Sequence, residues 1–148
     1  MASQSGNSQD DRACYLADEL KRAHAGQLYF LPYNFGAHWV LVIINPCSNC
    51  VYFFDSMQQP ICDGLKNVVE SGLQMCGLKQ KLPIWEKVKC PHQLTSTECG
   101  FYVMRYMKEI IDEQMHAINL EFNGKNSYTK EEIDEVRAEW GIIMQAYI

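Results

Sequence analysis

The sequence lacks several features that would place it in a membrane, secreted or nucleic-acid-binding class. No stretch of its 148 residues approaches the roughly 18 consecutive apolar residues that a membrane-spanning helix needs. The N-terminal segment MASQSGNSQDD is polar and has no apolar signal region, so it does not predict export. An excess of positive charge is also missing, because 18 acidic residues outweigh 13 lysines and arginines and give a net charge of −5. We therefore expect neither a membrane nor a nucleic acid as a partner.

Cysteine is not scarce, but its number argues against a disulfide framework. The chain has seven cysteines, an odd number, and nothing in it indicates export. This favours a reducing compartment, the cytosol or the nucleus. Most of these thiols are then core or surface residues, and at most one or two carry chemistry.

The chain has neither an internal repeat nor a linker that would divide it, and 47% of its residues are hydrophobic. These features predict one domain at residues 10–148, after a disordered leader at residues 1–9. Apolar periodicity predicts helices at residues 10–24, 61–76 and 96–113, and a last helix after Thr129. β-prone runs predict strands at residues 28–32, 38–45, 51–56 and 83–90. The expected fold is α+β, with helices packed on a small sheet.

A histidine and an aspartate bracket the predicted hairpin of residues 38–56. His38 starts one arm and Asp55 ends the other, and the turn PCSNC lies between the arms. Residues equidistant from a turn face each other, with directly opposed Cβ atoms about 4.5–5.5 Å apart. The pattern therefore predicts a His38–Asp55 contact at the open end of the hairpin, in a register that the sequence leaves open. An imidazole held by a carboxylate is the base and its orienting group in a nucleophilic triad.

A cysteine lies at the start of the helix predicted in LTSTECGFYVMRYMKEII. TSTE (residues 95–98) reads as a capping box, as does TKEE (residues 129–132), so Cys99 falls in the first turn of its helix. Free N–H groups at a helix N-terminus stabilise a thiolate. Gly100 leaves room for a substrate backbone, and Gln93 can donate to an oxyanion. The alternative is a buried helical cysteine without chemistry.

The His38–Asp55 pair and the cysteine at the helix start together favour catalysis, whereas either one alone has a structural explanation. A base with its orienting acid, a thiol at a helix start and an oxyanion donor just before the thiol are the four parts of one catalytic site. Papain-like proteases place the cysteine first in the chain, whereas here the order is histidine, aspartate, glutamine, cysteine.

With these motifs in view, the sequence resembles the ubiquitin-like-protein-specific cysteine proteases, the SUMO (sentrin) protease family, with adenovirus protease as a distant relative. That family has His-Trp at a strand start, Asp-Ser 17 residues after the His, and Gln six residues before a Cys-Gly that opens a helix. The matching positions here are His38-Trp39, Asp55-Ser56, Gln93 and Cys99-Gly100. The segment LYFLPYNFGAHWVLVIINP is similar in sequence to that of plant, transposon-associated members of the family.

The resemblance implies a fold and a role for each matched residue. The fold would be the papain-like superfold of the adenain/SUMO-protease type, a small mixed sheet with a central hairpin. Cys99 would be the nucleophile, His38 the general base and Asp55 its orienting group. Gln93 would help to form the oxyanion hole, and Trp39 would shape a channel for a Gly-Gly tail. No metal or cofactor is implied.

The resemblance also implies a substrate, a partner and a location. The reaction would be hydrolysis after the Gly-Gly tail of a ubiquitin-like modifier, most simply SUMO, in precursor processing or in deconjugation. The protein would act as a monomer inside the cell, with the nucleus suggested by the family alone. Compared with family members, the chain is expected to lack part of the domain before LYFLPYN. It also has Thr95 and Glu98 where the family commonly has Asn and Asp.

Three other hypotheses remain open from the sequence. The first is a transposon-derived relic that is catalytically weakened and acts only as a protein-binding domain. The second is an acyltransferase, because bacterial effector acetyltransferases use a related His–acid–Cys set. The third is a zinc module with four ligands, Cys47, Cys50, Cys90 and His92.

Overall fold

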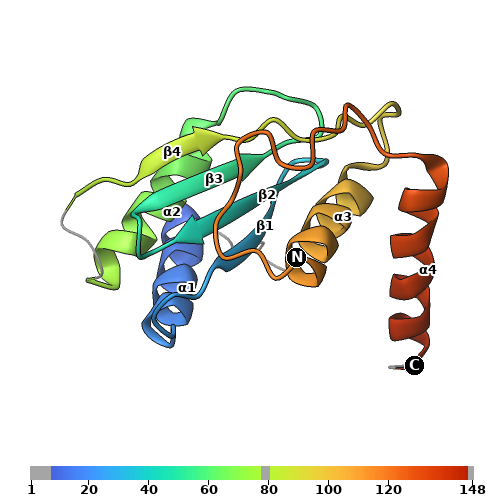
Figure 1. Ribbon diagram of the computed structural model, residues 1–148. Helices are drawn as coiled ribbons and strands as arrows, with labels where there is room; N and C mark the ends of the chain where they lie inside the picture. Colours follow the sequence, from blue (N-terminus) through green and yellow to red (C-terminus); the bar gives the residue numbers. More distant parts are fainter. Residues whose placement is uncertain (1–7, 78–80, 147–148) are drawn as a thin grey trace.

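The computed structural model describes residues 8–77 and 81–146, which form four helices and one four-stranded sheet (Figure 1). The helices are α1 (Gln9–Lys21), α2 (Asp63–Met75), α3 (Cys99–Asp112) and α4 (Lys130–Ala146). The strands are β1 (Tyr29–Phe35), β2 (His38–Asn45), β3 (Cys50–Phe54) and β4 (Ile84–Lys87). None of the helices described is long and apolar enough to cross a membrane. The α+β prediction is confirmed.

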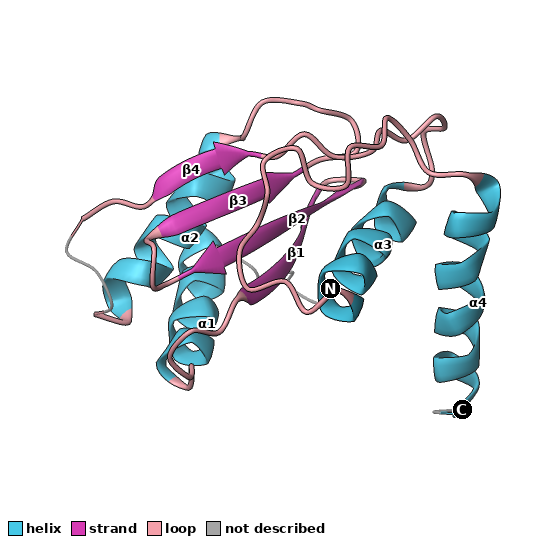
Figure 2. Cartoon of the chain, viewed as in Figure 1, coloured by secondary structure: helices cyan, strands magenta, loops and turns pink. Residues whose placement is uncertain are grey.

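The sheet is mixed and follows chain order, β1-β2-β3-β4. β1, β2 and β3 are antiparallel neighbours, whereas β4 joins β3 in parallel (Figure 2). A parallel pair needs a crossover connection, and α2 lies within it. The hairpin β2–β3 is therefore central, as expected for the family fold.

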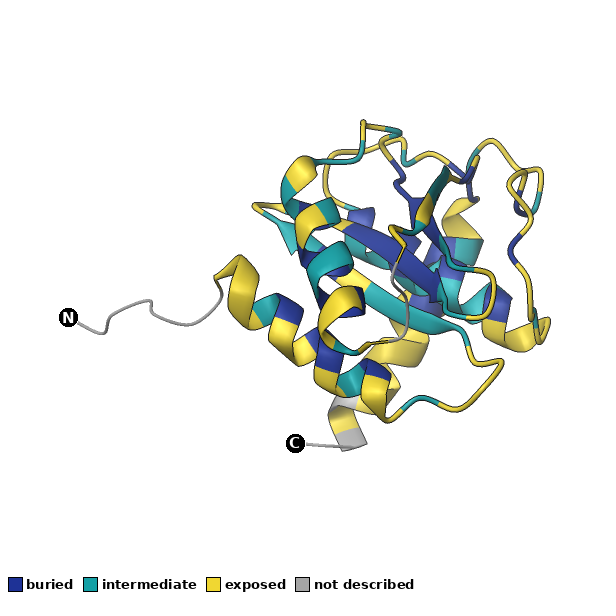
Figure 3. Cartoon of the chain, turned by 90° about the vertical axis from the view of Figure 1, so that its left-hand side faces the viewer, coloured by how far each residue is buried: buried dark blue, intermediate teal, exposed yellow. Residues whose placement is uncertain are grey.

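Strand β2 is covered on both faces. Its residues Val40, Leu41, Val42, Ile43 and Ile44 are all buried. The odd-numbered ones pack toward α3, and the even-numbered ones pack toward α1 and α2. A continuous apolar run is what a strand between two helical layers requires. Figure 3 shows this buried strand between its helices.

The first helix begins earlier than predicted. Ser8 caps α1: its hydroxyl accepts from the backbone N–H of Asp11, and the Asp11 carboxylate accepts from the Ser8 backbone N–H. This capping box places Gln9 inside the helix rather than in a leader; residues 1–7 of the predicted leader lie outside the described residues. On this helix Ala13 is buried, whereas Cys14 is exposed.

Strand β1 is an edge strand and runs further than predicted. It was predicted at residues 28–32, but it continues to Phe35, and only Tyr33 in it is buried. Pro32 is tolerated because an edge strand leaves one side of its backbone unpaired. The two-residue turn Gly36–Ala37 then leads straight into His38. Gly36 has φ +75°, as the first position of a type II′ hairpin turn requires.

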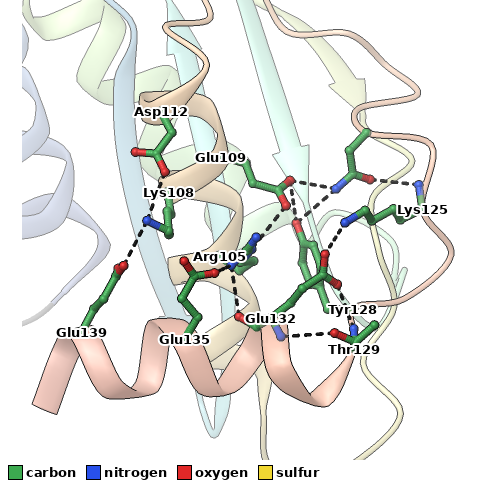
Figure 4. A network of polar contacts seen from close by, with 11 residues as sticks. Arg105, Lys108, Glu109, Asp112, Lys125, Tyr128, Thr129, Glu132, Glu135 and Glu139 are labelled. Atoms are coloured by element: carbon green, nitrogen blue, oxygen red, sulfur yellow. Dashed lines mark hydrogen bonds and ion pairs between the residues drawn. The ribbon is translucent and has the colours of Figure 1, made fainter.

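Helix α4 packs on α3 through a cluster of ion pairs (Figure 4). Arg105 of α3 reaches Glu135 of α4, and Lys108 of α3 lies 3.1 Å from Glu139 of α4. The predicted capping box at the start of α4 is confirmed, because Thr129 and Glu132 each accept from the other's backbone N–H. This cluster attaches the C-terminal helix to the helix that begins with Cys99.

We expect Gly36→Ala to lower the free energy of unfolding by about 1 kcal/mol, because a side chain at positive φ is strained. The matched control is Gly141→Ala, which has open space around it and an ordinary φ and should leave stability unchanged or slightly raised. Denaturant midpoints of the two variants provide the measurement. Equal stabilities would contradict a strained turn before His38.

Candidate active site

His38 and Asp55 form a short hydrogen bond at the end of the central hairpin. His38 Nε2 lies 2.6 Å from Asp55 Oδ1, which confirms the contact predicted from the sequence. The register pairs Leu41 with Phe54, so Asp55 falls opposite Val40 and meets His38 across a diagonal. Because a carboxylate can only accept, the shared proton lies on Nε2, and Nδ1 is the ring nitrogen left to act as a base.

The carboxylate of Asp55 is fully buried and its hydrogen bonds are filled. Besides His38, Oδ1 accepts from the backbone N–H of Met57 at 2.8 Å, and Oδ2 accepts from that of Gln59 at 3.1 Å. These bonds fold the chain after β3 back around the carboxylate. A buried charge with several donors is held in one orientation, and so is the imidazole bonded to it.

Cys99 is the first residue of α3, and the capping box predicted before it is wrong. The helix begins at Cys99 rather than near Ser96, and Glu98 at the N-cap position makes no side-chain capping bond. The Glu98 carboxylate instead lies 3.7 Å from Arg137 of α4, which balances a negative charge beside the thiol. An uncapped helix start leaves the backbone N–H groups of its first turn, that of Cys99 included, open to a ligand.

The thiol of Cys99 lies against the backbone on both sides of His38. The Trp39 N–H donates to Sγ at 3.4 Å, and Sγ is 4.0 Å from the carbonyl oxygen of Ala37. No hydrogen bond joins the His38 ring to Cys99 among the described residues. Catalytic hydrogen bonds in unliganded proteins are often long and tighten only when substrate binds. The thiol therefore lies against the backbone that carries the base, and the imidazole would move onto the sulfur when substrate binds.

The side chain of Gln93 is held by Ser56, a residue to which no role was assigned from the sequence. The Ser56 hydroxyl donates to Gln93 Oε1 at 2.5 Å, and the Gln93 backbone N–H donates to the Ser56 carbonyl at 3.0 Å. Gln93 Nε2 donates one hydrogen to the Thr95 carbonyl at 2.6 Å, which leaves its second hydrogen free for a ligand. Ser56 is only 2% exposed. Buried polar groups are hydrogen-bonded as a rule, and the Ser56 hydroxyl meets this rule through Gln93. The Asp-Ser pair in the sequence was the signal that could have indicated a role for Ser56.

Hydrogen bonds attach the loop that carries Gln93 to the core. The buried Tyr106 hydroxyl donates to the Pro91 carbonyl at 2.5 Å, and burial raises the pKa of Tyr106. The Ser127 hydroxyl donates to the carbonyl of His92 at 2.8 Å. Cys90 at the start of this loop is buried, and burial raises the pKa of its thiol. Cys90 is therefore a structural cysteine, and the imidazole of His92 is exposed.

Trp39 and Gly100 lie together beside the thiol. Trp39 is 41% exposed, although the five residues that follow it in β2 are buried. A Cβ atom added at Gly100 would meet Trp39 Cδ1 at 3.7 Å, an ordinary contact. Internal packing therefore does not require glycine here, and the space belongs to the surface next to Cys99.

The zinc hypothesis is contradicted by the arrangement of its four ligands. No group of three or more metal-ligating side chains forms within residues 8–77 and 81–146. Cys47 and Cys50 lie at the β2–β3 turn, and Cys90 bonds instead to Gln58 and to the carbonyl of Asp55.

Similarity to one solved structure supports the fold. A cysteine-to-alanine mutant of Xanthomonas XopD is 19% identical and has a TM-score of 0.53; the match covers 91% of this chain and 77% of that one. Xanthomonas campestris XopD bound to ubiquitin is 14% identical, with a TM-score of 0.46 and 93% of each chain covered. Curated proteins gave no match.

The family assignment rests on a separate comparison. Residues 26–147 match the model of the Ulp1 protease family, C-terminal catalytic domain. The match spans most of the chain and contains every residue of the site described above. The chain belongs to the Ulp1 protease family of cysteine peptidases.

Proposed function

We propose that the protein hydrolyses the bond after the Gly-Gly tail of a ubiquitin-like modifier, with Cys99, His38 and Asp55 as its triad. One observation carries the proposal. His38 is bonded at 2.6 Å to a buried carboxylate, while the backbone on both sides of His38 touches the Cys99 sulfur. A base, its orienting group and a thiol at a helix start meet in one place.

The mechanism assigns each proton to a particular atom. His38 Nδ1 takes the proton of Cys99, and Sγ attacks the carbonyl carbon of the last glycine. His38 then donates that proton to the leaving amine, which leaves a thioester on Cys99. A water molecule, deprotonated by His38, hydrolyses the thioester and frees the tail and the thiol. Asp55 stays ionised and stabilises the imidazolium each time it forms.

Gln93 and the start of α3 supply the oxyanion hole. The free hydrogen of Gln93 Nε2 and the backbone N–H of Cys99 donate hydrogen bonds to the oxyanion of the tetrahedral intermediate. Ser56 acts as a positioning residue, because its hydroxyl occupies Gln93 Oε1 and so turns the amide nitrogen toward the site.

The positions of Trp39 and Gly100 beside the thiol support the proposed substrate class. An extended Gly-Gly tail has no side chains, so it can lie along the exposed indole beside the helix start, where bulkier residues would clash. SUMO is the modifier that the family resemblance favours, as a precursor or as a conjugate to lysine. A relic that only binds the modifier is the second candidate.

We expect the purified chain to form a covalent adduct with SUMO that carries a C-terminal vinyl sulfone. NEDD8 and ubiquitin probes are run in parallel, and Cys99→Ala is the control. An adduct that requires Cys99 supports the protease, and the reacting probe identifies its modifier. A folded chain that binds a modifier yet forms no adduct would favour the relic. An adduct that survives Cys99→Ala would contradict the assignment of the nucleophile.

We expect Ser56→Ala to lower kcat by about tenfold with little change in KM, because Gln93 loses its orientation. Gln93→Ala should lower kcat by about 10²–10³-fold, the usual cost of one oxyanion donor. Ser56→Thr keeps a hydroxyl, so its kcat should stay close to that of the parent chain. Steady-state cleavage of a modifier with a C-terminal fluorophore measures all three variants. If threonine rescues no better than alanine, Ser56 does not act through its hydroxyl.

A further inference from the structure

An apolar cavity of about 400 Å³ opens beside the nucleophile. It lies between the start of β2, helix α3 and helix α4. Its lining is Pro32, Trp39, Gly100, Val103, Met104, Met107 and Trp140. None of these side chains carries a charge. Two lining residues adjoin the thiol: Gly100 follows Cys99 in the chain, and the N–H of Trp39 touches Sγ, so the cavity lies next to the nucleophile.

Two half-exposed tryptophans from different parts of the chain form its outer walls. Trp39 is 41% exposed and Trp140 is 47% exposed, and large apolar side chains left open in this way mark binding surfaces. Trp140 lies four residues after the buried Val136 on α4, yet the rest of the chain does not cover it. The adjacent Glu139 pairs with Lys108 of α3, which holds this turn of α4 against α3 (Figure 4).

We propose that this cavity binds a bulky apolar side chain on the acyl half of the substrate, in the tail just before the two glycines. The proposal rests on the proposed function and deepens it. A Gly-Gly segment offers no side chain to fill such a volume. The acyl half stays bonded to Cys99 through both steps, so contacts next to Gly100 hold it until the thioester is hydrolysed. Met104 and Met107 are flexible and adapt to different apolar shapes.

The lining also limits what the cavity can take. A charged side chain would lose its hydration there without meeting an opposite charge, and an amide would find only the indole N–H groups of the two tryptophans as side-chain partners. We therefore expect selection between tails that share the two glycines but differ before them. A tail with leucine should be favoured over the same tail with asparagine, which has almost the same shape. Trp140 then acts as a specificity residue contributed by the C-terminal helix.

The test uses fluorogenic peptides that end in Gly-Gly, with leucine or asparagine at the third or the fourth position before the cleaved bond. We expect kcat/KM to favour leucine by about tenfold or more at one position, a usual size for filling an apolar subsite. Trp140→Ala should reduce this ratio toward one, and Trp140→Phe should keep most of it. The matched control is Ile142→Ala on the same helix, which is 69% exposed and outside the lining, and it should keep the ratio.

A binding arm separates this proposal from the proposed reaction. The Cys99→Ala chain is titrated with the same peptides as free acids, with and without Trp140→Ala. Tighter binding of the leucine peptide that depends on Trp140 supports the cavity even if the parent chain cleaves nothing. Cleavage without preference for leucine, a preference that Trp140→Ala leaves intact, or an apolar preference only on the leaving side would overturn the proposal. Equal binding of both peptides by a folded Cys99→Ala chain would overturn it as well.

Discussion

The site depends on one hydrogen bond, the 2.6 Å contact between His38 and the buried carboxylate of Asp55. A buried carboxylate without donors would destabilise the fold, so the chain after β3 turns back and gives it two backbone N–H groups. The same turn places Ser56 beneath Gln93. One buried charge thus fixes the orientation of the base and the position of the residue that supports the oxyanion donor. Removing it would disturb structure and chemistry together.

Catalytic geometry and core packing come from the same elements. Strand β2 begins with His38 and continues into five buried residues, and helix α3 begins with Cys99 and packs against that strand. Because the strand and the helix are both locked into the core, their first residues cannot drift apart. Proteins often place reactive groups on rigid elements, which hold the side chains in place. The contribution of α4 is different: it packs through the buried Ile133 and Val136, is linked to α3 by ion pairs, and adds Trp140 to the surface.

Local patterns in the sequence predicted most of this arrangement. The hairpin and its terminal His38 and Asp55 were readable because β-propensity and turn residues fix the two arms. The register was not, since it depends on the conformation of the turn between the arms. The start of α3 was misplaced because TSTE matches a capping box, while the structure gives the Thr95 carbonyl to Gln93. The parallel pairing of β4 and the role of Ser56 depend on contacts between distant segments, which no local pattern encodes.

The most direct test of the account is the rate at which iodoacetamide alkylates Cys99, followed by peptide mass spectrometry in the parent chain and in His38→Ala. The reagent needs no modifier, so it reports only on the activation of the thiol. The exposed Cys14 and Cys47 serve as references within the same sample. The account predicts that Cys99 reacts faster than both, and that His38→Ala slows Cys99 alone by about 10²-fold or more. If Cys99 reacts no faster than the references, or at the same rate in the variant, His38 does not activate it and the proposed triad is wrong.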